Sequence, residues 1–393
     1  MPRPAVAVIA LAAVALLGAV PASAAPAPPQ RSWSTDAVRV PDARAPGLQG
    51  RGVLVAVLDS WVDRSHPDFG GRVRRGADCL SGTCRPGQAA DGCDHGTHVA
   101  GTLAASSFGV APAVEVLPVR VLAVDPRTRE CVGTPADVAA GIRWAVQRGA
   151  RVLNLSLGAG VAGQGGGSAI PAAVEQARRA GVLVVFSAGN DDLPVADAYD
   201  GSAVVVAATG PTGELASYSQ HGRGVTLAAP GGDADGGTCT PATCVTSLFP
   251  RGRYAVAAGT SMAAPLVSDV AALLLAQDPT RTPEELTRLL TSTARPLEGA
   301  GAGLLDAAAA LGAATRPSAE SRAAAAPRSA PAPRAADPSP VPPPAASPPA
   351  PPPLAAPPTA PPVPVGLGLL AAALVVLGGG GVVRATRRPG RSG

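Results

Sequence analysis

Four short apolar runs recur along the middle of the chain and alternate with segments of helical periodicity. The runs are rich in Val and Leu and cover residues 53–59, 114–122, 150–157 and 181–189. The helical segments cover residues 95–106, 134–149, 169–181 and 259–277. Continuous apolar strands that alternate with helices are typical of a parallel sheet covered on both faces. We therefore predict a three-layer α/β domain, mostly parallel, from residue 48 to residue 314.

Polar residues lie where these runs end. Asp59 closes the first run, Asn190 follows the fourth, and His95 and His98 open the first helical segment. Because functional groups collect at the carboxyl ends of parallel strands, we expect these side chains to approach one another. Taken singly, Asp59 and Asn190 could be turn residues, and the histidines could lie at the surface. A metal site at His95 and His98 is disfavoured because no third ligand of the usual kind lies near them in the sequence.

Two hydroxyls precede the last apolar helix, in the stretch "GTSMAAP". Thr260 and Ser261 could cap that helix, because Ser and Thr accept bonds from its first N–H groups. One of them could instead be a nucleophile, and the stretch alone does not decide. Pro265 fits near the start of the helix, where the first turn has no N–H bonds to lose.

The composition allows a large Val, Leu and Ala core in a chain of 393 residues that is 46% apolar and 3% aromatic. The net charge is +4, and every basic residue is Arg. These arginines are scattered through the domain, so we predict no nucleic-acid partner.

The two ends carry membrane signals. Residues 1–24 have the basic start, apolar run and A-x-A site of an export signal, with an uncleaved anchor as the alternative. Residues 25–47 form a short extension. Residues 315–364 are rich in Pro and Ala, which favours an extended stalk over a PxxP ligand. The charge-free run 365–383 would cover roughly 28 Å as a transmembrane helix. The basic tail 384–393 then lies inside, and we expect a single-pass protein of the cell membrane with an extracellular domain.

Together these pieces resemble the subtilisin-like serine proteases. The matching stretches are "VAVLDS", "DHGTHVAGT", "LNLSLG", "SAGN" and "GTSMAAP". The chain order Asp, His, Ser is that of the family. The resemblance implies a triad of Asp59, His95 and Ser261, an oxyanion hole formed by Asn190 and the Ser261 N–H, and endopeptidase activity through an acyl-enzyme. Ser261 is then the nucleophile. An esterase is less favoured because Ser261 does not lie in a G-x-S-x-G elbow.

The resemblance also implies that extended polypeptide substrates bind by strand addition. The substrate-binding residues would be Ser156, Leu157 and Gly158 on one side, and Ser187, Ala188 and Gly189 on the other. One position departs from the family, which usually has Gly where this chain has Trp61. Trp61 would strain the turn if the turn requires a positive φ, and Asp63 is the alternative carboxylate. A binding or scaffold module with impaired catalysis is therefore the alternative function.

Six cysteines in an exported chain are candidates for disulfides. By resemblance to some secreted members of the family we expect Cys93–Cys131. Sequence proximity then pairs the remaining four as Cys79–Cys84 and Cys239–Cys244, with free buried thiols as the alternative.

The extension, stalk, anchor and tail also resemble those of mycosins, the membrane-anchored subtilisin-like proteases of type VII secretion. That resemblance implies a secretion complex as a further partner. We predict no cofactor or metal. Calcium at Asp191–Asp192 or at Asp233 and Asp235 is the alternative to solvated loops.

Overall fold

The computed structural model describes residues 9–10, 32–40, 47–158, 169–197, 199–234 and 238–315. The predicted stalk, transmembrane helix and basic tail lie outside these residues, as does nearly all of the export signal. Within them, the one helix long and apolar enough to cross a membrane is α6 (Thr260–Gln277), and 89% of its apolar window is buried in the protein. That helix belongs to the core.

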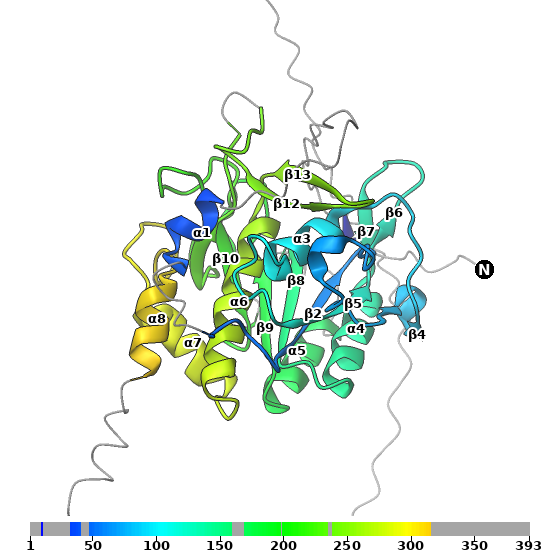
Figure 1. Ribbon diagram of the computed structural model, residues 1–393, viewed down its shortest axis with the longest axis horizontal. Coiled ribbons are helices and arrows are strands. Elements are labelled where there is room, and N and C mark those ends of the chain that lie inside the picture. Colours follow the sequence, from blue (N-terminus) through cyan, green and yellow to red (C-terminus); the bar gives the residue numbers. More distant parts are fainter. Residues whose placement is uncertain are drawn as a thin grey trace, which may run out of the picture. The chain divides into compact units, whose positions relative to one another are not determined.

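An eight-stranded sheet forms the centre of the domain (Figure 1). Its strands, in spatial order, are β11 (Leu227–Pro230), β10 (Val204–Thr209), β9 (Leu183–Ser187), β8 (Val152–Gly158), β2 (Leu54–Asp59), β5 (Glu115–Arg120), β3 (Ala77–Asp78) and β4 (Arg85–Pro86). Neighbouring strands are parallel except for β3 and β4. The four predicted apolar runs became β2, β5, β8 and β9, and the mostly parallel sheet is confirmed.

Helices cover both faces of this sheet. Alternate strand residues separate into two hydrophobic clusters, as the two-residue period of a strand requires. One cluster packs against α3 (His95–Ala104), α6, α7 (Pro283–Ser292) and α8 (Ala307–Ala314). The other packs against α4 (Pro135–Gln147) and α5 (Ala169–Arg179). The predicted three layers are therefore present.

Several shorter elements complete the domain. They are the 3₁₀ turns η1 (Pro67–Phe69) and η2 (Leu80–Gly82), the antiparallel pair β12 (Val245–Phe249) and β13 (Arg253–Ala257), and a small sheet of β6 (Ala123–Val124), β7 (Cys131–Gly133) and β1 (Ile9–Ala10). Capping boxes begin α4 at Thr134 and α7 at Thr282, each followed directly by Pro.

Part of the predicted N-terminal extension packs with the domain. Helix α1 (Trp33–Ala37) lies near α8 in Figure 1, and Val38 is fully buried in the core. The indole N–H of Trp33 donates to the Cys244 carbonyl at 3.0 Å, and Arg39 forms an ion pair with Asp306 at 2.8 Å. Residues 32–40 therefore contribute to the same hydrophobic core as residues beyond 47.

Candidate active site

The carboxyl end of β2 and the start of α3 meet at Asp59 and His95. Asp59 is the last residue of β2, and its carboxylate accepts bonds from His95 Nδ1 at 2.8 Å and from the Ser60 N–H at 2.7 Å. Asp59 is fully buried, and the His95 side chain is 10% exposed. The bond through Nδ1 leaves Nε2 as the free ring nitrogen, and this buried atom makes no hydrogen bond in the structure.

Burial by itself lowers the pKa of His95, because it disfavours the charged ring. The negative charge of Asp59 and its hydrogen bond act in the opposite direction and outweigh burial. The pKa of His95 is therefore raised above its ordinary value of 6.5. An imidazole in this environment can hold a proton during a reaction and release it at neutral pH.

Close backbone packing fixes how α3 begins. The Gly96 N–H donates to the Ser60 hydroxyl at 2.9 Å, so Ser60 caps an orphan donor of the first helical turn from outside the helix. A Cβ atom on Gly96 would lie 2.8 Å from the Ser60 carbonyl oxygen and 2.9 Å from that of Trp61. Only glycine permits this approach, which places His95 against Asp59.

Trp61 does not strain the turn that follows Asp59. The described non-glycine residues with a positive φ do not include Trp61, so this turn does not require a glycine. Asp63, the alternative carboxylate, serves the loop instead, because it accepts bonds from the Ser65 hydroxyl and from the Arg251 N–H at 2.8 Å. Asp59, not Asp63, is hydrogen-bonded to His95, so the alternative assignment of Asp63 as the carboxylate of the triad was wrong.

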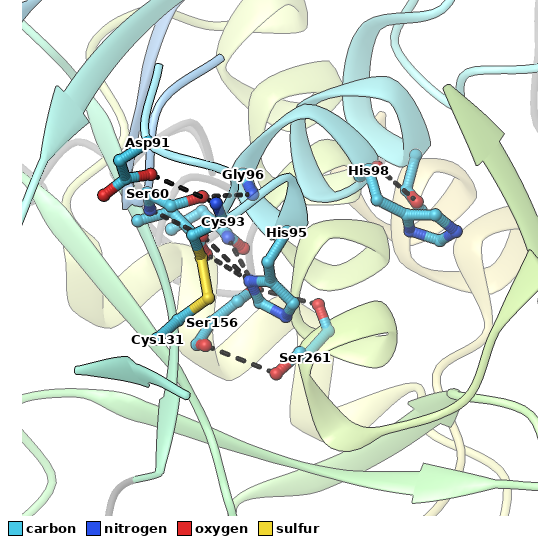
Figure 2. Close-up of polar contacts among 12 residues, drawn as sticks. Ser60, Asp91, Cys93, His95, Gly96, His98, Cys131, Ser156 and Ser261 are labelled. Carbon is cyan, nitrogen blue, oxygen red and sulfur yellow. Dashed lines mark hydrogen bonds and ion pairs between the residues drawn. A yellow bond between two sulfur atoms is a disulfide. The ribbon is translucent and has the colours of Figure 1, made fainter. Parts of the chain in front are cut away.

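Ser261 is the second residue of α6, where a backbone N–H has no acceptor within the helix. It is 2% exposed, and its hydroxyl donates to the Ser156 carbonyl at 3.3 Å rather than to His95. Figure 2 shows the His95 ring beside Ser156 and Ser261. Ser261 Oγ and His95 Nε2 thus form no hydrogen bond in this structure, and catalytic hydrogen bonds often tighten only when substrate is bound.

Pro265 corrects one expectation from the sequence. Because α6 begins at Thr260, Pro265 lies beyond the first turn and within the helix proper. It does remove a helical bond: the missing N–H would have served the carbonyl of Ser261, four residues earlier. The Ser156 hydroxyl donates to that carbonyl at 2.8 Å instead.

Asn190 contacts Thr260, the residue before Ser261, and its amide has a fixed direction. Its Oδ1 accepts bonds from both the N–H and the hydroxyl of Thr260, each at 2.9 Å. Since both donors occupy the oxygen, Nδ2 is the free end of the amide. A Cβ atom on Gly259 would lie 3.5 Å from that nitrogen, so glycine keeps the surroundings of Nδ2 open.

The predicted substrate walls lie on the adjacent strands β8 and β9. The pairing of β8 with β9 shifts register between Leu155 and Gly158, and such irregularities are common beside active sites. Beyond the shift Gly158 pairs with Ser187, so the two groups of residues expected to contact substrate lie on neighbouring strands: Ser156, Leu157 and Gly158 on β8, and Ser187, Ala188 and Gly189 at the end of β9. Residues 159–168, which follow the first wall, are not among those described.

His98, the second histidine of the helical start, is a core residue rather than a ligand. It is 3% exposed, and its ring lies against the backbone of Val245 and Ala255 without a hydrogen bond of good geometry. Burial, with a smaller contribution from His95, lowers its pKa to about 3. His98 is therefore neutral near pH 7.

All six cysteines form the three expected bridges, Cys79–Cys84, Cys93–Cys131 and Cys239–Cys244. The second bridge joins the residue two before His95 to β7. Over the described ranges no group of three or more His, Cys, Asp or Glu side chains could hold a metal ion. Asp233 accepts bonds from Ser217, Asp191 lies beside the Gln220 amide, and Asp235 is not among the described residues.

A parallel sheet that brings Asp, His and Ser together in that chain order, with the serine at a helix N-terminus, defines a serine protease of the subtilisin class. The comparisons with known proteins agree. The family model of the subtilase family matches residues 50–316, and the chain belongs to this family.

Curated relatives cover the same region. Subtilisin BL of Lederbergia lenta is 37% identical over 290 residues, which span 71% of this chain and 97% of that protein. Subtilisin E of Bacillus subtilis is 34% identical over 287 residues, which span 70% of this chain and 69% of that protein. A solved protease of Pseudoalteromonas arctica PAMC 21717 superposes with a TM-score of 0.61 at 32% identity, over 71% of this chain and 94% of that one. The chain is therefore a subtilisin-like serine protease.

Proposed function

We propose that this protease is an active endopeptidase in which Ser261 is the nucleophile, His95 the general base and acid, and Asp59 the residue that orients His95. The observation that carries the proposal is the buried bond between Asp59 and Nδ1 of His95, which leaves Nε2 unbonded beside Ser261. A serine hydroxyl is a weak nucleophile near neutral pH and requires such a base.

The reaction then follows from the geometry. Ser261 Oγ attacks the peptide carbonyl carbon while its proton passes to His95 Nε2. The Asn190 Nδ2 and the Ser261 N–H stabilise the oxygen that becomes negative. The C–N bond breaks as His95 returns the proton to the leaving amine. Water, deprotonated by His95, releases the acyl group from Ser261.

An extended peptide adds beside Ser156, Leu157 and Gly158, with its reacting residue between these and Ser187, Ala188 and Gly189. The contacts of β8 support this placement, because Gly158 pairs with Ser187 of the other wall and Ser156 is hydrogen-bonded to Ser261. Main-chain bonds supply affinity, and side-chain pockets supply preference.

A fluorophosphonate probe tests the proposal, because it reacts covalently with an activated serine. We expect wild-type protein to be labelled and Ser261→Ala not to be labelled at the same folded concentration. Equal labelling of both proteins would instead support the alternative, a scaffold that holds peptides without cleaving them.

We propose further that the domain is exported, anchored by residues 365–383 and faces outward, as in mycosin-like proteases that act with a type VII secretion complex. The apolar run and the arginines that follow it support this placement. External protease added to intact cells should remove the domain while leaving a short anchored fragment. Protection of the domain in intact cells, or its recovery in the soluble fraction, would contradict the placement.

A further inference from the structure

A buried chain of hydrogen bonds connects the middle of α6 to the backbone of Ser261. Ser268 Oγ donates to Asn154 Oδ1 at 2.9 Å, and Asn154 Nδ2 donates to Ser156 Oγ at 3.0 Å. Ser156 Oγ then donates to the Ser261 carbonyl at 2.8 Å. Ser268, Asn154 and Ser156 have no solvent exposure, so water does not compete for these bonds.

The periods of helix and strand bring these side chains together. Ser261 and Ser268 are two turns apart on α6 and therefore share one face of the helix. Asn154 and Ser156 are alternate residues of β8 and therefore point to the same side of the sheet. Helix α6 covers that side, since its residues pack in the same hydrophobic cluster as Val152.

This series of hydrogen bonds replaces one that helix α6 lacks. Pro265 has no N–H for the Ser261 carbonyl, so this carbonyl needs a donor from outside the helix. A buried carbonyl without a hydrogen-bond partner is costly, because it has given up its bonds to water. The Ser156 hydroxyl supplies the donor, as Figure 2 shows for the contact between these two serines.

Which group donates at each step of this hydrogen-bond series depends on Ser268, at its far end. Because Ser268 donates to Oδ1, the amide of Asn154 must turn Nδ2 toward Ser156. The single proton of the Ser156 hydroxyl is then directed away from Asn154 and toward Ser261. Without Ser268 the Asn154 amide could reverse, and Ser156 would donate to its oxygen and abandon the Ser261 carbonyl.

We propose that Ser268 and Asn154 are positioning residues for the nucleophile: they act through Ser156 to hold the main chain of Ser261. This inference rests on the proposed function of Ser261. The same stretch of backbone carries the nucleophilic oxygen and one of the two oxyanion donors. Displacement of it therefore affects the chemical step more than peptide binding along β8.

The first test replaces Ser268 with Ala and compares kcat and KM for one peptide substrate. We expect kcat to fall about tenfold, which corresponds to ~1.4 kcal/mol in the barrier, with KM changed less than about twofold. Ser268→Thr keeps the hydroxyl and should recover most of kcat. Ser34→Ala is the matched control, because Ser34 lies in α1 and has a buried hydroxyl bonded to that of Ser32, and its loss should leave both constants unchanged.

The second test uses Pro265. Pro265→Ala restores an N–H four residues after Ser261, so the carbonyl regains a donor within the helix. In the Pro265→Ala protein, Ser268→Ala should lower kcat by less than about threefold. The effects of the two substitutions would then not add, as expected when both residues act on the Ser261 carbonyl.

If Ser268→Ala gives no folded protein, Asn154→Asp provides the comparison at nearly constant volume. An ionised carboxylate only accepts hydrogen bonds, so Ser156 would donate to it and release Ser261, whereas the protonated acid still has a proton to donate to Ser156. The ratio of variant kcat to wild-type kcat should therefore fall as pH rises, and a constant ratio near one would overturn the inference.

Three results in the Ser268 series would also overturn it. These are an unchanged kcat in Ser268→Ala, a loss confined to KM, and a loss that neither Ser268→Thr nor Pro265→Ala reduces. A wild-type protein without peptidase activity would remove the proposed function and this inference together. An active wild type with an equally active Ser268→Ala would remove the inference alone.

Discussion

Nδ1 of His95 lies 2.8 Å from Oδ1 of Asp59 and 3.0 Å from Oδ2, at the point where β2 ends and α3 begins. A buried carboxylate in this position fixes the ring tautomer and directs Nε2 toward the reaction. The same carboxylate raises the pKa of His95 against the opposing effect of burial. One contact thus determines both which nitrogen takes the proton and the pH range in which it does so.

The pH dependence of kcat/KM should report this contact. Because His95 must be neutral to act as the base and its pKa is raised, wild-type kcat/KM should fall as pH decreases through a value above 6.5. In Asp59→Asn the charge is lost, so this limb should move to lower pH, and kcat should fall by about 10⁴-fold. Rates measured from about pH 5 to 8 test both statements. An unchanged limb in the variant would contradict the assignment of Asp59.

Gly96→Ala should separate His95 from Asp59. The new Cβ would lie 2.8 Å from the Ser60 carbonyl oxygen, so α3 must move away from the end of β2. A displacement of about 1 Å can cost on the order of 10²-fold in rate, and we expect a loss of that size in kcat.

Gly312→Ala is the matched control for this change. Gly312 lies in α8, and a Cβ atom there has nothing within 4 Å. Alanine in that helix should add about 0.5–1 kcal/mol to stability without lowering kcat. Wild-type kinetics in Gly96→Ala would show that the helix tolerates the added methyl group.

The Cys93–Cys131 disulfide should contribute more to stability than either of the two bridges that close short loops. Cys93–Cys131 joins residues 38 apart, whereas Cys239–Cys244 joins residues 5 apart. In the chain-entropy account the longer loop contributes roughly 4 kcal/mol and the shorter roughly 2 kcal/mol. Replacing each pair by serine and measuring chemical unfolding should give losses in that order, and the reverse order would contradict the account.

His98 should make the protein sensitive to acid. The unfolded chain binds a proton at His98 near pH 6.5, but the folded protein does so only near its lowered pKa of about 3. Stability should therefore be lost as pH falls from 6.5 toward 3, by up to ~1.4 kcal/mol per pH unit from this group. His98→Asn removes this contribution, so its stability deficit relative to wild type at pH 8 should shrink in acid. A deficit that stays constant with pH would contradict this.

Much of the fold could be predicted because its signals are local. A strand buried on both faces must be continuously apolar, and the helices between such strands carry a 3.6-residue period. The four predicted strands and the helices at His95, Pro135, Ala169 and Thr260 therefore appear within a few residues of their expected bounds. The packing of residues 32–40 carried no such signal, because α1 is only five residues long.

The residue types of the site were also visible in the sequence, but their geometry was not. Asp59, His95, Asn190 and Ser261 stood out by their positions at strand and helix ends. Whether Asp59 or Asp63 served His95 depended on the turn at Trp61, and the sequence could not give its φ. Pro265 was misjudged for a similar reason, since its cost depends on where α6 begins.

The sequence by itself determined the layers of the domain, because the hydrophobic period requires each strand and helix to bury a particular face. It also determined which chemical groups were available at the ends of those elements. Only the tertiary structure decided which of them touch, because hydrogen bonds such as that from Ser268 to Asn154 join residues 114 positions apart. Contacts at that separation depend on how α6 lies against β8, and no local pattern records that arrangement.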